Sequence, residues 1–302
     1  MAVTLIEFNK TVTDPMRSGI IQTLYTEETF FQYIPFQPIP GLAYAYNKEQ
    51  ALPGIAFRPI NGAYTATAPV VQREVEALKP FGGESDTDVA LVKAYGMQKR
   101  SERDSLFAKA MAVKYLQFFL YGNSPASRAG VAYDDINGFD GIQARLSAGA
   151  QWLDGGGSTG ADGSSVFAIR FGEGYCTGLQ TPEGVDAQDL GVLQASPAYR
   201  TRIEHIAGMC IEHGKSVVCM KDLTAATTVL TCAKMDQIVD ACAGKPTVIL
   251  MSKRSRRQLK ADAFGLGVTL ALTLDELGKP IPAWDDVPIL VSDAVIDTET
   301  VS

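Results

Sequence analysis

The 302-residue chain is long enough for one large domain or two ordinary ones. Apolar residues make up 46% of it and charged residues 20%, a globular composition that excludes a mainly disordered or low-complexity chain. The formal net charge of −7 argues against sequence-independent binding of nucleic acid, which needs a surplus of Lys and Arg.

Residues 1–35 are predicted to form an N-terminal arm with one short helix. The Thr-Asp-Pro motif at 13–15 is a helix-start signal, and apolar residues then recur at helical spacing. The stretch 30–41 is aromatic and rich in proline, which lacks the backbone donor and clashes with the preceding helical turn. This stretch therefore cannot continue the helix.

Residues 42–80 are predicted to form a two-stranded ribbon. Tyr44 and Tyr46 alternate with small residues in the period-two pattern of a strand, and turn signals follow at 52–54 and 61–62. Neither face carries many large apolar residues, and a hairpin of two strands is marginal by itself in water. The ribbon is therefore expected to rest on something outside its own domain.

Residues 97–121 show the clearest helical pattern of the chain. Neither glycine nor proline interrupts this stretch, and Gly122 ends it. At ~1.5 Å per residue the helix is expected to span ~36 Å. Its charged residues gather on one side. The predicted apolar stripe consists of Leu106, Phe107, Ala110, Met111, Val113, Phe118 and Leu120.

The rest of the chain is predicted to contain strands first and an α/β region afterwards. Glycine-rich segments at 137–142 and 154–163 precede or separate the strands. From residue 225 onwards the pattern alternates between helix and strand. Strands are predicted at 165–171, 202–211, 216–220, 246–251, 268–273 and 287–291, and helices at 235–243 and 252–263.

Three segments approximate ligand-binding motifs but lack a required residue. The segment 172–178 resembles the dinucleotide fingerprint, but its third glycine is one place late and Pro182 blocks the helix that should follow. The run 155–163 lacks the Gly-Lys-Ser/Thr ending of a phosphate-binding loop. The aspartate-rich segment 134–140 places Phe139 where a calcium ligand belongs. We therefore expect turns and surface loops here, without a cofactor.

The five scattered cysteines and two histidines do not have the number or spacing of ordinary zinc sites. The thiols are expected to be reduced and mostly buried, as in a protein that folds in the cytosol. Neither His205 nor His213 has a Ser or Cys neighbour in triad order, so neither a catalytic site nor a metal is expected. No secretory signal or membrane-spanning apolar run is evident, and no membrane contact is expected.

One concentrated basic patch lies at 253–260. Aromatic residues do not interleave with its cations, which favours a solvated or subunit-pairing helix face over a nucleic-acid site. The candidate inter-subunit contact residues are Tyr44, Tyr46, Leu52 and Ile55 in the ribbon and Arg254, Arg256 and Arg257 in the basic helix. Acidic candidates for pairing with the basic helix are Asp275, Glu276, Asp285 and Asp286.

The order of these parts resembles that of the major capsid proteins of tailed bacteriophages, which share the Hong Kong 97 fold with encapsulins. The likeness spans nearly the whole chain, and its short motifs gain specificity from their order and spacing. They are Ala-Tyr-Ala-Tyr-Asn at 43–47, Leu-Pro-Gly at 52–54, Gly-Phe-Asp-Gly-Ile at 138–142, Val-Phe-Ala-Ile-Arg-Phe-Gly at 166–172 and a segment starting Lys-Pro-Ile at 279–293.

The resemblance implies an α+β fold of the Hong Kong 97 type with four parts. These are an N-terminal arm at 1–35, an extended loop formed by a β-hairpin at 36–86, a peripheral domain with a long spine helix at 87–222, and an axial α/β domain at 223–302. In the best-known members the chain visits the axial domain before it returns to the long peripheral strands. Here the strand-rich part comes first, which suggests a permuted connectivity.

The implied function is that of a major capsid protein, which self-assembles into an icosahedral shell around double-stranded DNA and is not an enzyme. Implied partners are other copies in hexamers and pentamers, a portal protein, a scaffold, a decoration protein, and packaged DNA bound without sequence specificity. Assembly is expected in the host bacterial cytoplasm and residence in the virion capsid. The alternatives are an encapsulin-type compartment, which encloses protein cargo, and an enzyme, which a stable pocket with perturbed carboxylates would support.

Overall fold

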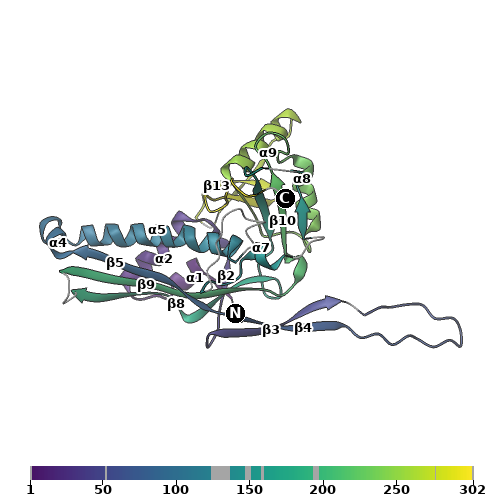
Figure 1. Cartoon of the computed structure of the whole chain (residues 1–302), viewed down its shortest axis with the longest axis horizontal. Helices are drawn as coiled ribbons and strands as arrows, with labels where there is room; N and C mark the ends of the chain where they lie inside the picture. The colour runs from purple at the N-terminus through teal and green to yellow at the C-terminus, as the bar shows by residue number, and fades with distance from the viewer. Residues whose placement is uncertain are drawn as a thin grey trace.

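The computed structural model describes residues 2–51, 53–123, 137–146, 151–157, 160–192, 197–275 and 277–300, with the backbone alone at 49–51. A long helix lies over a five-stranded sheet, a second sheet with its own helices stands at one end, and a two-stranded ribbon projects beneath it (Figure 1). The fold is therefore mixed α+β, as predicted.

The five-stranded sheet has the order β1-β2-β8-β9-β5. The long strands β8 and β9 pair antiparallel, and β5 pairs antiparallel with β9 along its whole length. The N-terminal arm extends this sheet, since β2 runs parallel to β8 and β1 pairs with β2. The strands are β1 (Val3–Thr4), β2 (Pro35–Pro38), β5 (Lys79–Asp88), β8 (Cys176–Val192) and β9 (Ala198–Ile211).

The long helix α5 (Gln98–Tyr121), here called the spine helix, confirms the prediction for 97–121. Tyr115 lies at the centre of its buried face, with its ring 5.3 Å from that of Phe31 and 5.8 Å from that of His205. The predicted stripe is wrong at Ala110, which is exposed, and at Leu106, which is 64% exposed. Leu106 and Met111 are five residues apart, so their side chains point in widely different directions around the helix, and only Met111 faces the core.

Shorter helices accompany the spine helix. The predicted arm helix is confirmed as α2 (Pro15–Glu27), whose N-cap Asp14 accepts a hydrogen bond from the backbone N of Met16. The prediction of a single arm helix is wrong, because two short helices flank α2 within residues 1–35. Helix α2 packs against the spine helix. The remaining helices on this side of the molecule are α1 (Leu5–Asn9), α2 (Pro15–Glu27), α3 (Phe30–Tyr33), α4 (Val89–Tyr95) and α7 (Ile142–Arg145).

The second sheet has the order β12-β13-β14-β11-β7-β10-β6. Its central strand β7 is buried on both faces, because Val166 and Ala168 pack with α8 and α9 while Phe167 and Ile169 join the core of the spine helix. Its elements are β6 (Trp152–Asp154), β7 (Ser164–Ile169), a 3₁₀ turn η1 (Gly214–Ser216), β10 (Val217–Leu223), α8 (Cys232–Ala241), β11 (Val248–Met251), α9 (Lys253–Gly265), β12 (Ala271–Leu274), β13 (Pro280–Trp284) and β14 (Val287–Val291).

The connectivity corrects the expected boundary at 222/223. Strands β6 and β7 precede this boundary and β10 crosses it at its last residue, yet all three belong to the same sheet as β11 to β14. The chain enters the second sheet at β6, leaves it for β8 and β9, and returns at β10. A strand-rich part followed by an α/β part is therefore not the order in the structure, and the reason for expecting a permuted connectivity disappears.

Candidate inter-subunit contact surfaces

The ribbon consists of β3 (Ala43–Ala51) and β4 (Val70–Ala77), which pair antiparallel from Ala43 opposite Ala77 to Ala51 opposite Val70. Residues 79–88, which were expected to belong to the extended loop in part, form β5 of the body instead. Beyond the paired strands, the ribbon tip (residues 53–69) projects away from the body (Figure 1). The described part of the ribbon is thus a separate arm anchored only at its base.

The ribbon exposes large apolar side chains to an unusual degree. Ile55 is 96% exposed and Phe57 has no measurable burial. Exposed apolar groups gathered in such numbers on one segment mark a contact surface. The exposed large apolar residues of the ribbon and its base are Leu42, Ile55, Phe57, Ile60, Tyr64, Val70, Val71 and Val75.

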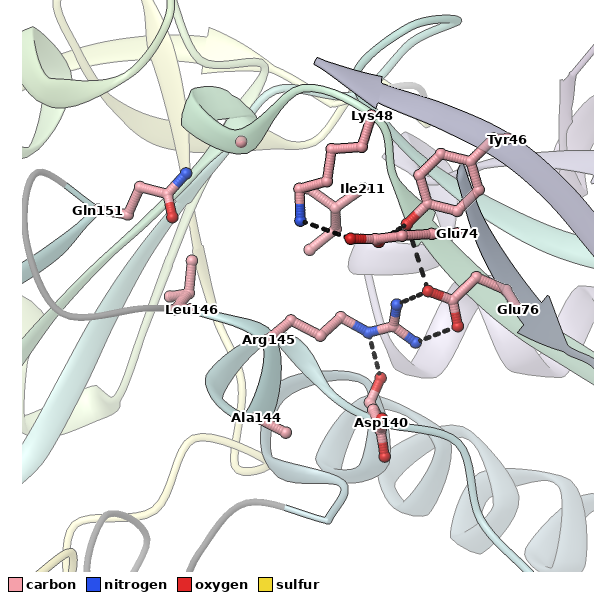
Figure 2. A pocket seen from close by; sticks show the side chains of 11 residues that line it. Tyr46, Lys48, Glu74, Glu76, Asp140, Ala144, Arg145, Leu146, Gln151 and Ile211 are labelled. Carbon is pink, nitrogen blue, oxygen red and sulfur yellow. Dashed lines mark hydrogen bonds and ion pairs between the residues drawn. The ribbon is translucent and has the colours of Figure 1, made fainter. Parts of the chain in front are cut away.

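The base of the ribbon is held by buried charges. Arg145 of α7 binds Glu76 of β4 through both carboxylate oxygens, and the Nη2–Oε2 distance is 2.8 Å (Figure 2). The hydroxyl of Tyr46 donates to Glu74 at 2.9 Å and to Glu76 at 3.3 Å. Lys48 Nζ lies 3.6 Å from Glu74. These groups line a pocket of about 240 Å³ between the ribbon and the body.

The electrostatics of the base favour one charge state. Burial and the hydrogen bond to Glu74 raise the pKa of Tyr46, so its hydroxyl keeps its proton. Burial by itself would lower the pKa of Arg145, but the hydrogen bonds and charge of Glu76 raise it above its usual value. The arrangement therefore forms a fixed ion pair with a neutral tyrosine beside it.

The turn after the spine helix positions Arg145. The backbone N of Gly141 donates to the carbonyl of Gly122 at 2.7 Å, and a Cβ on Gly141 would lie only 2.4 Å from the Gly122 nitrogen. Both glycines are thus required by the close approach of the two backbones. Arg145 Nε then donates to the carbonyl of Asp140 at 2.9 Å. The Gly-Phe-Asp-Gly motif consequently couples the end of the spine helix to the ribbon.

Two of the predicted ribbon contacts are used within the chain. Tyr44 and Tyr46 stack on each other with ring centroids 6.0 Å apart, and Tyr44 OH lies 3.3 Å from Glu212. Tyr46 is buried at the base of the ribbon, so it is not available to a neighbour. Ile55 is fully available, and Leu52 lies outside the described residues.

The arginines of the basic helix α9 differ in their surroundings. Arg254 is held inside the chain, since it donates to the carbonyls of Asp297 and Leu223 at 3.2 Å each. These bonds engage its guanidinium within the chain, and its expected role as an inter-subunit contact stays a prediction. Arg256 and Arg257 are exposed, and within the described part of the chain neither has an ion-pair partner.

The acidic candidates also differ from one another. Asp285 and Asp286 are exposed in the tight turn between β13 and β14, and Asp286 lies 3.6 Å from Lys245. Asp275 is buried, because its side chain accepts hydrogen bonds from the backbone of Leu277 and Lys279. Glu276 lies outside the described residues. Of the three acidic candidates that the structure describes, Asp285 and Asp286 are therefore the ones exposed to another subunit.

Sequence reasoning missed a second apolar surface at the far edge of the second sheet. Strand β12 is an edge strand, and Leu272 and Leu274 project from it into solvent. Phe264 is 88% exposed at the end of α9. The sequence predicted a strand at 268–273 but not its exposure. The position of this strand after the basic helix was the signal that could have identified the surface. The patch consists of Phe264, Leu266, Val268, Leu272 and Leu274.

The described residues contain no group of three or more His, Cys, Asp and Glu side chains that could hold a metal ion. All five cysteines are free thiols and buried. In the segment 172–178, Gly172 and Gly174 have positive φ and form a turn between β7 and β8. None of the described helices is long and apolar enough to cross a bilayer.

Comparison with known proteins places these features in context. A family model described as major capsid protein GP7 matches residues 48–302. A solved structure of bacteriophage Epsilon15 aligns with a TM-score of 0.51 at 16% identity, covering 88% of this chain and 87% of the other. The capsid of bacteriophage JBD30 aligns with a TM-score of 0.50 at 12% identity, covering 88% and 90%. No protein in the curated comparison matches the sequence.

Proposed function

The chain belongs to the family of major capsid proteins described as GP7 and is a shell-forming subunit of a tailed phage; from this premise we propose how it assembles. Copies associate into hexamers and pentamers that close an icosahedral shell around double-stranded DNA. The shell forms in the cytoplasm of the host bacterium and persists as the virion capsid. A scaffold, a portal protein and a decoration protein are its proposed companions.

The observation that supports this proposal most strongly is the ribbon. It carries exposed apolar residues along a projecting arm that has no core of its own. A two-stranded hairpin is marginal in isolation, so the contacts that complete it come from another copy. The ribbon accordingly lies over the spine helix and the five-stranded sheet of a neighbour.

We propose that the two sheets correspond to the two main units of a shell subunit. The peripheral unit then contains the spine helix and the five-stranded sheet. The axial unit contains the seven-stranded sheet with α8 and α9, and it surrounds the five-fold and six-fold axes. Strands β6, β7 and β10 belong to the axial unit, in place of the boundary expected at 222/223.

A catalytic role is not part of the proposal. Among the described histidine and carboxyl groups, burial lowers the pKa of His205 to about 4 and raises that of Glu299 to about 7. His205 lies between Phe36 and Tyr115, and Glu299 accepts hydrogen bonds from Tyr121 and Ser165. Both groups are buried within the packed interior, so their shifts have structural causes.

Electron microscopy of the purified protein tests the proposal. Polyhedral shells of uniform size support it, and a monodisperse monomer at high concentration contradicts it. The contents of shells made during infection separate the capsid from a cargo compartment. Nuclease-resistant DNA is expected for the capsid, whereas a protein cargo without DNA would indicate an encapsulin-type compartment.

A further inference from the structure

We infer that the ribbon tip of one copy docks through Phe57 and Arg58 into a groove between α2 and the first half of the spine helix of the next copy. This inference rests on the proposed assembly through the ribbon, and it specifies the receiving site. The groove, here called the docking groove, has a volume of about 480 Å³.

The wall of the docking groove is apolar and adaptable. Met16 and Ile20 contribute from α2, and Met97 contributes from the start of the spine helix. Met97 is 57% exposed, which is unusual for a large apolar side chain that lines a groove. Methionine side chains adapt their shape to an incoming group and make favourable sulfur contacts with aromatic rings. This wall therefore suits an aromatic side chain such as Phe57.

The other side of the docking groove carries an excess of negative charge. Arg100 pairs with Asp189 at 2.6 Å, and Thr201 links Arg100 to Asp104 by hydrogen bonds. One guanidinium thus faces two carboxylates. Asp104 is buried, and its Oδ1 accepts no hydrogen bond from any residue that the structure describes. The net negative charge of these three side chains favours a cationic side chain from a neighbouring copy.

The ribbon tip carries the complementary features. Arg58 is the only charged residue among residues 53–69. Its Nη1 donates to the carbonyl of Gly62 at 2.8 Å, and its guanidinium lies 5.0 Å from the ring centroid of Tyr64. The cation is thus held against the ring of Tyr64, and the exposed Phe57 directly precedes it in the chain. The ring of Phe57 thus matches the apolar wall of the docking groove, and the charge of Arg58 matches the net negative charge of its other side.

The positions of the two surfaces require that they meet between copies. The ribbon tip lies at one end of the molecule, and the start of the spine helix lies at the opposite end (Figure 1). A contact between different surfaces at opposite ends is heterologous, and its repetition closes a ring when the rotation is suitable. The tip therefore reaches the docking groove of the next copy and not its own.

An alternative binding site for the ribbon tip, here called the rival hollow, lies on the opposite face of the spine helix. Phe81, Phe107 and Met111 line an open hollow of about 310 Å³ there, together with the cation Lys114. The apolar lining would accept Phe57 equally well. Lys114, however, repels Arg58, whereas the carboxylates of the docking groove attract it. Charge therefore selects the docking groove.

Disulfide trapping in assembled shells distinguishes the docking groove from the rival hollow. Ser101 lines the docking groove and Ala110 lines the rival hollow. The two exposed residues are nine positions apart, which places them on opposite sides of the helix. Phe57→Cys is combined with Ser101→Cys in one variant and with Ala110→Cys in its matched control. The native thiols are all buried, so they do not interfere.

On mild oxidation, the Ser101→Cys variant is expected to give a ladder of covalent oligomers in denaturing gels, at least tenfold stronger than that of the Ala110→Cys control. A stronger ladder from the control, or none from either variant in intact shells, overturns the docking groove while the shell function stands. Wild-type protein that never forms shells contradicts the proposed function itself. A cysteine variant that fails to assemble is replaced by the charge series that follows.

Three single variants form the charge series. Arg58→Glu is expected to lower the yield of shells about tenfold, and Arg58→Lys is expected to keep it within twofold of wild type. Arg73→Glu makes the same charge change at an exposed position on β4 outside the tip, and it is the matched control with near-normal yield. Normal assembly of Arg58→Glu, or an equal loss in Arg73→Glu, contradicts the inference.

Discussion

Arg145 and Glu76 face each other across the base of the ribbon, and the guanidinium contacts both carboxylate oxygens (Figure 2). The two residues are 69 positions apart in the chain and both are largely buried. Through this pair the ribbon is attached to the turn that follows the spine helix. This ion pair and the two glycines behind it therefore contribute to the direction in which the ribbon leaves the body.

Arg145→Ala is expected to destabilise the chain by about 3–5 kcal/mol, because it leaves Glu76 charged and without its main partner. Chemical denaturation of the unassembled protein measures this loss. The exposed pair between Lys253 and Asp293 is the control, and Lys253→Ala is expected to cost no more than about 1 kcal/mol. Equal effects of the two variants would show that the pair at the ribbon base is no stronger than a surface contact.

Glu299 is expected to make stability depend on pH between about 4.5 and 7. Its pKa is raised by burial to about 7, so the folded state binds its proton more tightly than the unfolded state does. The free energy of unfolding therefore falls as pH rises through this window, by about 3 kcal/mol from this group. The glutamine of Glu299→Gln cannot ionise, so the free energy of unfolding of this variant should not show this fall with rising pH. An identical pH profile in the variant would contradict this role.

Met111→Asp is expected to abolish soluble folding, whereas Leu106→Asp leaves it intact. Met111 is buried against the sheet, and truncation of such a residue already costs about 2–5 kcal/mol before a charge is added. Leu106 lies in the same helix but is 64% exposed. Soluble yield and circular dichroism of the two proteins check this directly. Folded Met111→Asp protein would mean that the buried face has been assigned to the wrong side of the helix.

Ile55→Asp should impair assembly without changing the stability of the unassembled chain. The side chain is 96% exposed in the single copy, so the charge meets only water there. In the shell the same carboxylate would be desolvated against a neighbour. Thermal melting of the unassembled protein and the yield of shells measure the two effects separately. A lower melting temperature with normal shells is the opposite of what the ribbon contact predicts.

Arg256→Glu combined with Arg257→Glu tests whether the basic helix joins subunits or contacts DNA. Repeated ion pairs around a ring are expected to make the shell yield of this variant low, with a partial rescue when Asp285 and Asp286 are reversed as well. Contact with DNA predicts normal empty shells that package poorly, with a defect that depends steeply on salt. Shell yield at two ionic strengths decides, and normal yield at both contradicts the subunit contact.

The spine helix could be predicted closely, because an uninterrupted helical pattern is a local property of the chain. Strand β8 was missed, since Gly178, Pro182 and Gly184 look like turn signals although the strand continues through them with an irregular register. Membership in a sheet is not local, which explains why the sequence did not group β6, β7 and β10 with β11 to β14. Pairing across a sheet has no signature in the neighbouring residues.

The contact surfaces could be predicted only in part for a related reason. Composition identified the ribbon as a segment without a core, and Ile55 is confirmed as exposed. Arg254 and Arg256 look alike in the sequence, but a separation of two residues turns them to different sides of α9, and only the first reaches Asp297. The pair of Arg145 and Glu76 arises from the fold of distant segments, so no spacing rule could have indicated it.

The central claim is that each subunit completes its ribbon on a neighbouring subunit of a closed shell. A reconstruction of purified shells by electron cryomicroscopy tests it most directly. We expect the density of every ribbon to cross onto the adjacent subunit, with Phe57 and Arg58 next to Met97 and Asp189. Shells in which the ribbon folds back onto its own body, or in which residues 53–69 contact only solvent, would contradict the account.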